Sequence, residues 1–307
     1  MYSVVNQSQS PKHKTKQANL NSPTPTNRAS TWQLRTQTIT FGPIPAIMGI
    51  VNVTPDSFSD GGKFSQTDAA VKHAVKLADQ GAAILDIGGE STRPYSTPVD
   101  VDQELERVIP VIEKVVTQTD VPISIDTSKS VVAAAAIAAG AEIINDVTGL
   151  EGDPKMIEVA LQSGAGVCAM HMQGTPQNMQ DDPSYGNVTR EIHGYLAQRK
   201  SFLLDSGIAP QKICLDPGIG FGKSHDHNLQ LIQDCHQYHD LGCPILIGHS
   251  RKGFISKLLG GEATIAQRDA GTLAITLQLA QQGIQIIRVH EVANTVAALQ
   301  VQQGLAP

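Results

Sequence analysis

The feature that most constrains this chain is a unit that occurs eight times from residue 44 onward. Each unit has a short aliphatic run that ends in a polar residue, then a glycine-containing loop, then a segment with helical periodicity. The runs are continuously apolar and not alternating, which is typical of strands buried on both faces of a parallel sheet. They span residues 44–52, 83–88, 122–126, 142–146, 166–171, 212–216, 244–249 and 285–290.

The segments between the runs predict amphipathic helices, of which 188–206 and 264–282 are the longest. The predicted buried faces are Ala70, Val71, Ala74, Val75 and Ala78 in 67–80, and Leu105, Val108, Ile109, Ile112 and Val116 in 102–118. Glycines follow several helical segments, where a left-handed residue is favoured. They are Gly81, Gly140, Gly164, Gly207 and Gly283.

Eight strand–helix units predict an α/β fold, a (β/α)8 TIM barrel, which requires about 250 residues. Residues 31–42 predict a short additional strand or hairpin that covers the bottom of the barrel. No second domain is visible within the 307 residues, so 31–307 is predicted to form one barrel. An open, doubly wound sheet is the alternative architecture.

Composition separates residues 1–30 from the barrel. This segment has four basic residues, no acidic residue and many Ser, Thr, Asn, Gln and Pro. It predicts a disordered tail, and an organelle transit peptide is the alternative. Without its four positive charges, the net charge of −6 becomes about −10 for the rest, which argues against nucleic acid as a partner.

Hydropathy and cysteine usage point to the cytoplasm. No apolar run approaches the roughly 18 residues of a membrane span, so no membrane partner is expected. The four cysteines form no C-x-x-C pair, which fits a reducing compartment. They are interpreted as small buried apolar residues.

Polar residues lie at or near the ends of all eight predicted strands, and in a barrel these ends meet at the face that carries active sites. Asp126, Asn145 and Asp216 suit the hydrogen-bonding edge of a flat heterocycle, because a carboxylate can accept two N–H groups in a fork. Cationic groups for a phosphate or diphosphate are Arg93, Lys252, Arg288 and His290. Asn52 offers an oxygen to a Mg²⁺ that takes its other ligands from phosphate and water.

Seven motifs in order resemble the dihydropteroate synthase family over roughly residues 32–304. They are IMGIVNVTPDSFSDGG (47–62), LDIGGESTRP (85–94), ISIDTSK (123–129), IINDVTG (143–149), LDPGIGFGK (215–223), GHSRKG (248–253) and IIRVHEV (286–292). The resemblance implies a barrel that joins 6-hydroxymethyl-7,8-dihydropterin diphosphate to 4-aminobenzoate, with 7,8-dihydropteroate and diphosphate as products. It also implies Mg²⁺ as cofactor, a homodimer and sensitivity of the family to sulfonamides, which mimic 4-aminobenzoate.

The resemblance also assigns roles to individual residues. The implied pterin-binding set is Thr92, Asp126, Asn145, Asp216 and Lys252, and the implied diphosphate site is Arg288, Val289 and His290. Asn52 is the implied Mg²⁺ ligand. The implied 4-aminobenzoate pocket and lid loops contain Arg93, Pro94, Phe221, Thr54, Pro55 and Asp56. Tyr95-Ser96 departs from the small residues that the family often has there, so the closing of that loop is left open.

The residues favour a mechanism without a covalent intermediate, because no nucleophile with an adjacent base stands at a strand end. Diphosphate is expected to leave first, and the aromatic amine then attacks a ring-stabilised cation. A methyltetrahydrofolate-binding methyltransferase of the same barrel type, or a catalytically silent pterin-binding protein, is the alternative.

Several polar residues admit a structural interpretation. His171, Met170 and His249 are interpreted as packing residues. Asp226 in His-Asp-His is expected to cap a helix, and Asp86 is expected either to hold the loop after the second strand or to touch substrate.

Overall fold

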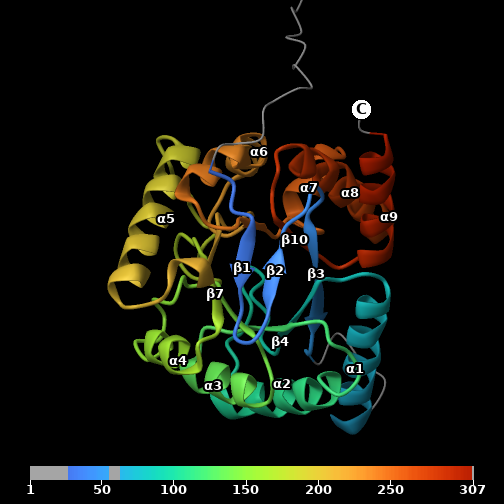
Figure 1. Cartoon of the computed structure of the whole chain (residues 1–307). Coiled ribbons are helices and arrows are strands. Elements are labelled where there is room, and N and C mark those ends of the chain that lie inside the picture. Colours follow the sequence, from blue (N-terminus) through green and yellow to red (C-terminus); the bar gives the residue numbers. More distant parts are fainter. Residues whose placement is uncertain (1–26, 55–62, 306–307) are drawn as a thin grey trace, which may run out of the picture.

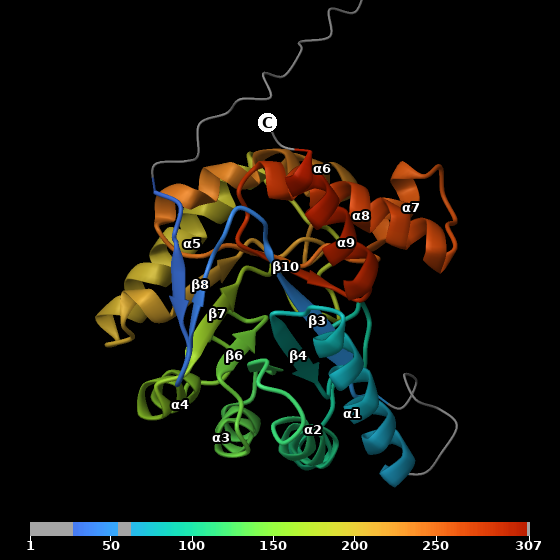
Figure 2. The same ribbon diagram turned by 45° about the vertical axis from the view of Figure 1, so that its right-hand side comes forward.

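The computed structural model describes residues 27–54 and 63–305, and in it eight parallel strands form one sheet (Figures 1 and 2). Their order is β8-β7-β6-β5-β4-β3-β10-β9, and a bridge between Leu215 and Ile245 joins the two ends. The strands are β3 (Ala46–Asn52), β4 (Ile84–Gly88), β5 (Ile123–Asp126), β6 (Ile143–Asp146), β7 (Gly166–Met170), β8 (Ile213–Asp216), β9 (Leu246–Ile247) and β10 (Ile286–Val289). The predicted barrel is confirmed, and the open sheet is excluded.

Helices surround the strands. They are α1 (Lys63–Asp79), α2 (Val101–Val115), α3 (Ser130–Ala138), α4 (Met156–Ser163), α5 (Val188–Asp205), α6 (His225–Asp234), α7 (Gly253–Leu258), α8 (Ile265–Gln281) and α9 (Val292–Gly304), with short 3-10 turns η2 (Pro210–Lys212) and η3 (Cys235–Leu241). All five glycines predicted to follow helices have positive φ, as the left-handed position requires. In the part of the chain that the structure describes, no helix is long and apolar enough to cross a membrane.

Two details of the helices differ from the prediction. The buried face of α2 includes Val111 and Val115, whereas Val116 is 39% exposed because the helix ends at Val115 and Val116 is its C-cap. The N-cap of α6 is Ser224 and not Asp226. Ser224 Oγ accepts from the His227 N–H, and His227 Nδ1 accepts from the Ser224 N–H, so a reciprocal capping box starts the helix two residues earlier.

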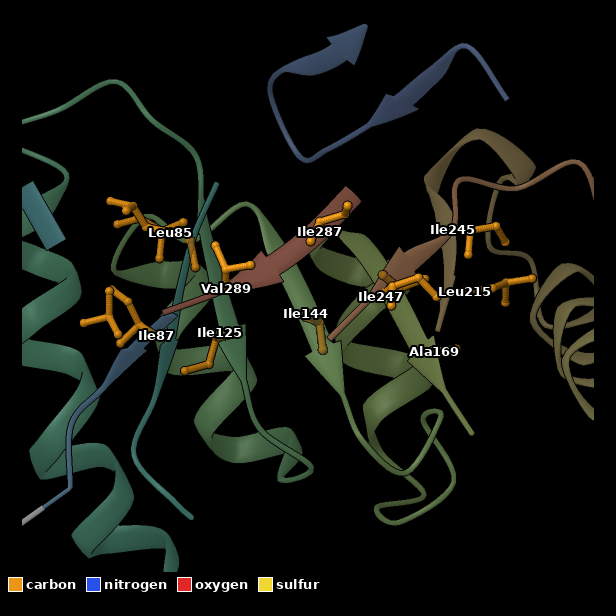
Figure 3. Close-up of a cluster of buried hydrophobic side chains, with 14 of the residues drawn as sticks. Leu85, Ile87, Ile125, Ile144, Ala169, Leu215, Ile245, Ile247, Ile287 and Val289 are labelled. Atoms are coloured by element: carbon orange, nitrogen blue, oxygen red, sulfur yellow. The ribbon is translucent and has the colours of Figure 1, made fainter. Parts of the chain in front are cut away.

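Strand residues alternate between the helix layer and the barrel interior. Figure 3 shows Ile87, Ile144 and Leu215 among the side chains of the outer apolar layer, which packs between strands and helices. Because successive residues point to opposite faces, Asn145 and Asp216, which follow Ile144 and Leu215, face the interior. The same alternation turns the polar residues of the other strands inward.

An antiparallel hairpin, β1 (Thr31–Gln33) and β2 (Thr38–Thr40), closes the N-terminal end of the barrel. Its Trp32 is fully buried, donates from Nε1 to Lys212 O at 2.9 Å, and packs in one cluster with Met48 and Ile286. This confirms the predicted cover. Because the hairpin covers the N-terminal end of the barrel, the open face is the one at the C-terminal ends of the strands.

The segment just before the hairpin is also attached to the barrel. Arg28 Nε donates to Gly283 O at 2.6 Å, and Gln285 Nε2 donates to Ala29 O at 3.2 Å. The predicted tail lies almost entirely in residues 1–26, which are outside the described residues.

Candidate active site

Charged and amide side chains from four strands meet inside the barrel at Arg288. Its Nη2 donates to Asp126 Oδ2 at 2.8 Å, and its Nε donates to Asp86 Oδ2 at 2.5 Å. Asn145 Nδ2 lies 3.3 Å from both carboxylate oxygens of Asp86. One hydrogen-bonded group therefore contains members of both predicted sets, Asp126 and Asn145 for the heterocycle and Arg288 for the anion.

The electrostatics of this group follow from burial and close pairing. Burial raises the pKa of Asp126 to about 7, although the Arg288 charge acts in the opposite direction. Burial lowers the pKa of Arg288, but Asp86 and Asp126 outweigh it and leave that pKa above its usual value. Arg288 therefore keeps its positive charge at neutral pH.

Asp216 is held by the glycine-rich loop that follows β8. The Gly218 N–H donates to Asp216 Oδ1 at 2.7 Å. Among the described residues, the other carboxylate oxygen, Oδ2, accepts no hydrogen bond. Gly218 has φ +70°, and a Cβ there would lie 2.0 Å from His171 O, so the turn requires glycine. Burial raises the pKa of Asp216 to about 6, against the hydrogen bond from Gly218 and the Lys223 charge. Oδ2 is left to accept from a ligand.

Lys252 and Phe221 contact each other beside Asp216. Lys252 Nζ lies 3.9 Å from the centre of the Phe221 ring, a cation–π contact. Burial lowers the pKa of Lys252 to about 8, and the Arg288 charge contributes to the shift. The structure thus brings the predicted pterin residue Lys252 against the predicted aminobenzoate residue Phe221.

His290 follows β10, and its surroundings disfavour the positive charge expected for it from the sequence. Its Nδ1 lies 2.9 Å from Ser250 Oγ. Burial lowers the pKa of His290 to about 3, and the surrounding cations act in the same direction; these are Arg251, Arg288, Arg93 and Lys252. A neutral imidazole among several positive groups is suited to donate a hydrogen bond to an anion that those groups attract.

Thr92, Arg93 and Pro94 lie in the β4–α2 loop (residues 89–100), where Arg93 and Pro94 are exposed. At its base, Lys129 forms ion pairs with Glu90 and with the fully buried Glu104. These pairs attach the start of the loop to β5 and α2.

The far part of the β4–α2 loop is attached to the segment between β7 and α5 (residues 171–187). Tyr95 has φ +62°, donates from its N–H to Pro176 O at 2.9 Å, and donates from Oη to Asp181 Oδ1 at 3.1 Å. β5 and β6 lie between β4 and β7 in the sheet. The loop therefore extends along the rim past the strands that carry Asp126 and Asn145.

Asn52 ends β3, which pairs with both β4 and β10. Its register partner is Gly88, and a Cβ on Gly88 would lie 3.2 Å from Asp126 Cβ. Asn52 is thus at the rim, next to the strands of Asp86 and Arg288. Thr54 lies two residues further along the described chain, whereas Pro55 and Asp56 lie outside the described residues.

Two buried residues of the site were not among the predicted binding residues. One is Asp86, which was expected either to hold the loop after the second strand or to touch substrate. The other is Lys223, 2% exposed, whose Nζ donates to Phe221 O at 2.7 Å and lies 3.0 Å from His171 Nδ1. Burial lowers the pKa of Lys223 well below its usual value. The position of Lys223 at the end of a glycine-rich loop indicated that it could belong to the site. The sequence did not show that its side chain points inward.

The residues interpreted as structural do pack. His171 is buried and contacts Lys223, and Met170 clusters with Phe221. His249 is fully buried, with Nε2 3.0 Å from Thr272 O. All four cysteines are buried and free.

Fold and site together define a barrel enzyme that binds a pterin, and comparison with known proteins supports this. The family described as pterin binding enzyme matches residues 48–290. The dihydropteroate synthase of Escherichia coli K12 is 46% identical over 260 residues, which cover 85% of this chain and 91% of the relative. The chain therefore belongs to the dihydropteroate synthase family of pterin-binding enzymes.

Solved structures agree with this assignment. A dihydropteroate synthase of Xanthomonas albilineans with 4-aminobenzoic acid superimposes with a TM-score of 0.84 at 45% identity, covering 91% of this chain and all of that one. The Xanthomonas albilineans enzyme in complex with 7,8-dihydropteroate gives a TM-score of 0.81 at 43% identity, covering 90% of this chain and all of that one.

Proposed function

We propose that this protein condenses 6-hydroxymethyl-7,8-dihydropterin diphosphate with 4-aminobenzoate to give 7,8-dihydropteroate and diphosphate. The observation that carries the proposal is the contact of Arg288 with Asp126. It places a cation beside the acceptors suited to a heterocycle, as a substrate with a polar ring and an anionic leaving group requires. The family membership and the ligands of the two Xanthomonas structures support the same reaction.

The pterin binds to carboxylate and amide groups inside the barrel. Asp216 Oδ2 accepts from the 2-amino and ring N–H groups, while Oδ1 stays bound to Gly218 N. Asp126 and Asn145 line the opposite side of the ring, and Lys252 and Thr92 complete this set. Because these groups are preorganised by the fold, they lose little freedom when the ring binds.

The reaction proceeds by departure of diphosphate before attack by the amine. The C–O bond of the side-chain carbon breaks with its electron pair on the leaving oxygen, and the electron-rich ring stabilises the resulting cation. Arg288 and the neutral His290 hold the diphosphate, with the Val289 backbone between them, and Asp126 offsets the positive charge of the pterin. The amine lone pair of 4-aminobenzoate then forms the C–N bond, and the proton is lost from nitrogen.

The protein stabilises charge and forms no covalent bond with substrate in this scheme. The thiols support it, because Cys168 and Cys214 lie in the apolar cluster under the hairpin, away from the rim. Trapping a pterin–protein adduct during turnover would contradict it.

Mg²⁺ is proposed to enter with the diphosphate, with Asn52 as one protein ligand. Mg²⁺ commonly keeps several waters and takes oxygen ligands from substrate phosphates. Asn52 fits this role because it supplies a neutral amide oxygen at the rim beside β10, which carries Arg288. When bound, the ion would neutralise charge on the departing diphosphate.

The 4-aminobenzoate pocket is proposed between Phe221 and the β4–α2 loop. Phe221 offers its ring next to Lys252, and Arg93 and Pro94 are exposed on the loop. Thr54, Pro55 and Asp56 are proposed to complete the pocket from the loop after β3.

The protein is also proposed to be a cytoplasmic homodimer. Apolar side chains exposed on α7, α8 and α9 and at their ends support self-association, and they are Leu258, Leu259, Ile265, Val301 and Leu305. Four buried free thiols fit a reducing compartment. Light scattering of the full chain should give twice the monomer mass, and a tagged chain should fractionate with cytoplasmic markers.

A diphosphate-release assay tests the function. The full chain with Mg²⁺ and dihydropterin diphosphate should release diphosphate and form 7,8-dihydropteroate when 4-aminobenzoate is added. Formation of no dihydropteroate by a folded protein that binds the pterin would refute the proposal, and it would favour a silent binding protein or a methyltransferase.

A further inference from the structure

Asp86 is a buried carboxylate that touches both halves of the site. It lies in the middle of β4, its side chain is 0% exposed, and its register partner Ser124 belongs to the strand that carries Asp126. A fully buried carboxylate has no access to bulk water, and its charge must be satisfied by protein groups. The groups that satisfy it are Arg288 and Asn145.

These contacts restrict the orientation of Arg288. The guanidinium is planar, and it is held at Nε by Asp86 and at Nη2 by Asp126. Two donors fixed to two different carboxylates determine the plane of the group, because rotation about the side chain would break one of the two bonds.

The same carboxylate restricts Asn145. With Nδ2 directed to Asp86, the amide oxygen is directed away from it. An amide without this partner could rotate by half a turn and exchange its donor and acceptor. Asp86 therefore determines that Asn145 presents its amide oxygen, and not its NH₂ group, to the ligand.

We infer that Asp86 is a positioning residue that fixes Arg288 and Asn145 as one unit, and so sets the place of the diphosphate relative to the pterin ring. The inference rests on the proposed function, in which Arg288 binds the leaving group and Asn145 the ring. Asp86 itself contacts no substrate.

Asp86→Asn tests the inference, because it keeps the shape of the side chain and removes its charge. One amide oxygen can still accept from Arg288, but the new NH₂ group faces Asn145 Nδ2, so donor meets donor and the Asn145 amide turns over. We expect the affinity for 6-hydroxymethylpterin to fall at least tenfold, about 1.4 kcal/mol, and the affinity for inorganic diphosphate to fall as well.

A matched control is Asp146→Asn. Asp146 is an equally buried carboxylate on β6, two strands from Asp86, but its Oδ1 accepts from Thr148 N and Oγ1 and not from the site. This variant should bind both ligands as the wild type does. If Asp86→Asn is too unstable to titrate, Asp86→Ser, which is smaller and uncharged, replaces it.

Double-mutant cycles separate positioning from a general loss of structure. Asn145→Ala should add little to the loss of pterin affinity in Asp86→Asn, and Arg288→Gln should add little to the loss of diphosphate affinity, because each pair acts as one unit. Full additivity, or an Asp86→Asn protein that binds both ligands within about twofold of wild type, would overturn the inference. A wild-type protein that makes no dihydropteroate would instead refute the proposed function.

Discussion

Replacing Asp216 by Asn should weaken pterin binding and at the same time stabilise the folded protein. Gly218 N–H occupies Oδ1 in the wild type, and the Asn amide oxygen can keep this bond. The NH₂ group then takes the place of Oδ2 and faces the N–H groups of the pterin. Leaving a buried donor without a partner costs about 1–3 kcal/mol, and loss of the charge adds to it. The affinity should therefore fall at least tenfold.

The effect on stability has the opposite sign. Burial raises the pKa of Asp216 from 3.8 to about 6, so between these pH values the folded protein holds a proton that the unfolded chain releases. Folding is therefore opposed as the pH rises through this window, and above pH 6 the ionised carboxylate costs up to about 3 kcal/mol. Asn removes this cost, so the melting temperature should rise at pH 7.5 and change little near pH 4.

Calorimetric titration with 6-hydroxymethylpterin and thermal unfolding measure the two effects on one sample. Wild-type affinity should also decline as the pH falls below 6, whereas the Asn variant should show no such decline. The reasoning is refuted if affinity stays within twofold of wild type. It is also refuted if affinity and melting temperature fall together, which would indicate damage to the fold.

Three further results are expected. Tyr95→Gly should be more stable than Tyr95→Ala by about 1 kcal/mol in urea unfolding, because alanine keeps the left-handed strain at φ +62° and glycine does not; equal stabilities would show that this φ is not maintained. Trp32→Ala should cost about 3–5 kcal/mol by the same measurement, since the side chain is fully buried against the barrel floor, and a cost below about 1 kcal/mol would argue against the hairpin as a cover. His290 should remain neutral at pH 6 in NMR titrations and begin to charge only toward its lowered pKa of about 3, so that a midpoint near 6.5 would contradict its burial among cations.

The order and number of the strands were predictable because a strand that is buried on both faces has a continuously apolar sequence. In the run 142–146 the apolar residues are Ile143 and Ile144, and the structure places Asn145 inward because Ile144 points outward. Convergence of Asp126, Asn145, Asp216 and Arg288 then follows from the closure of the barrel. Helix ends depended on finer contacts. The choice of Ser224 over Asp226 as the cap of α6 rests on the bond that His227 returns.

The parts of the site that could not be predicted depend on pairs far apart in the chain. Asp86 and Arg288 are 202 positions apart, and no local pattern shows that their side chains meet. The neutral state of His290 likewise depends on how deeply it is buried and how many cations surround it. The functions assigned to Pro55 and Asp56 remain predictions, because these residues lie outside the described residues.

The central claim is that one rim holds the pterin ring and the departing diphosphate side by side. A crystal structure of the full chain with 6-hydroxymethylpterin and inorganic diphosphate tests it most directly. The 2-amino edge of the ring should lie on Asp216, the ring between Asp126 and Lys252, and the diphosphate on Arg288 and His290. Ligands that occupy separate cavities, or a ring whose 2-amino edge points away from Asp216, would contradict it.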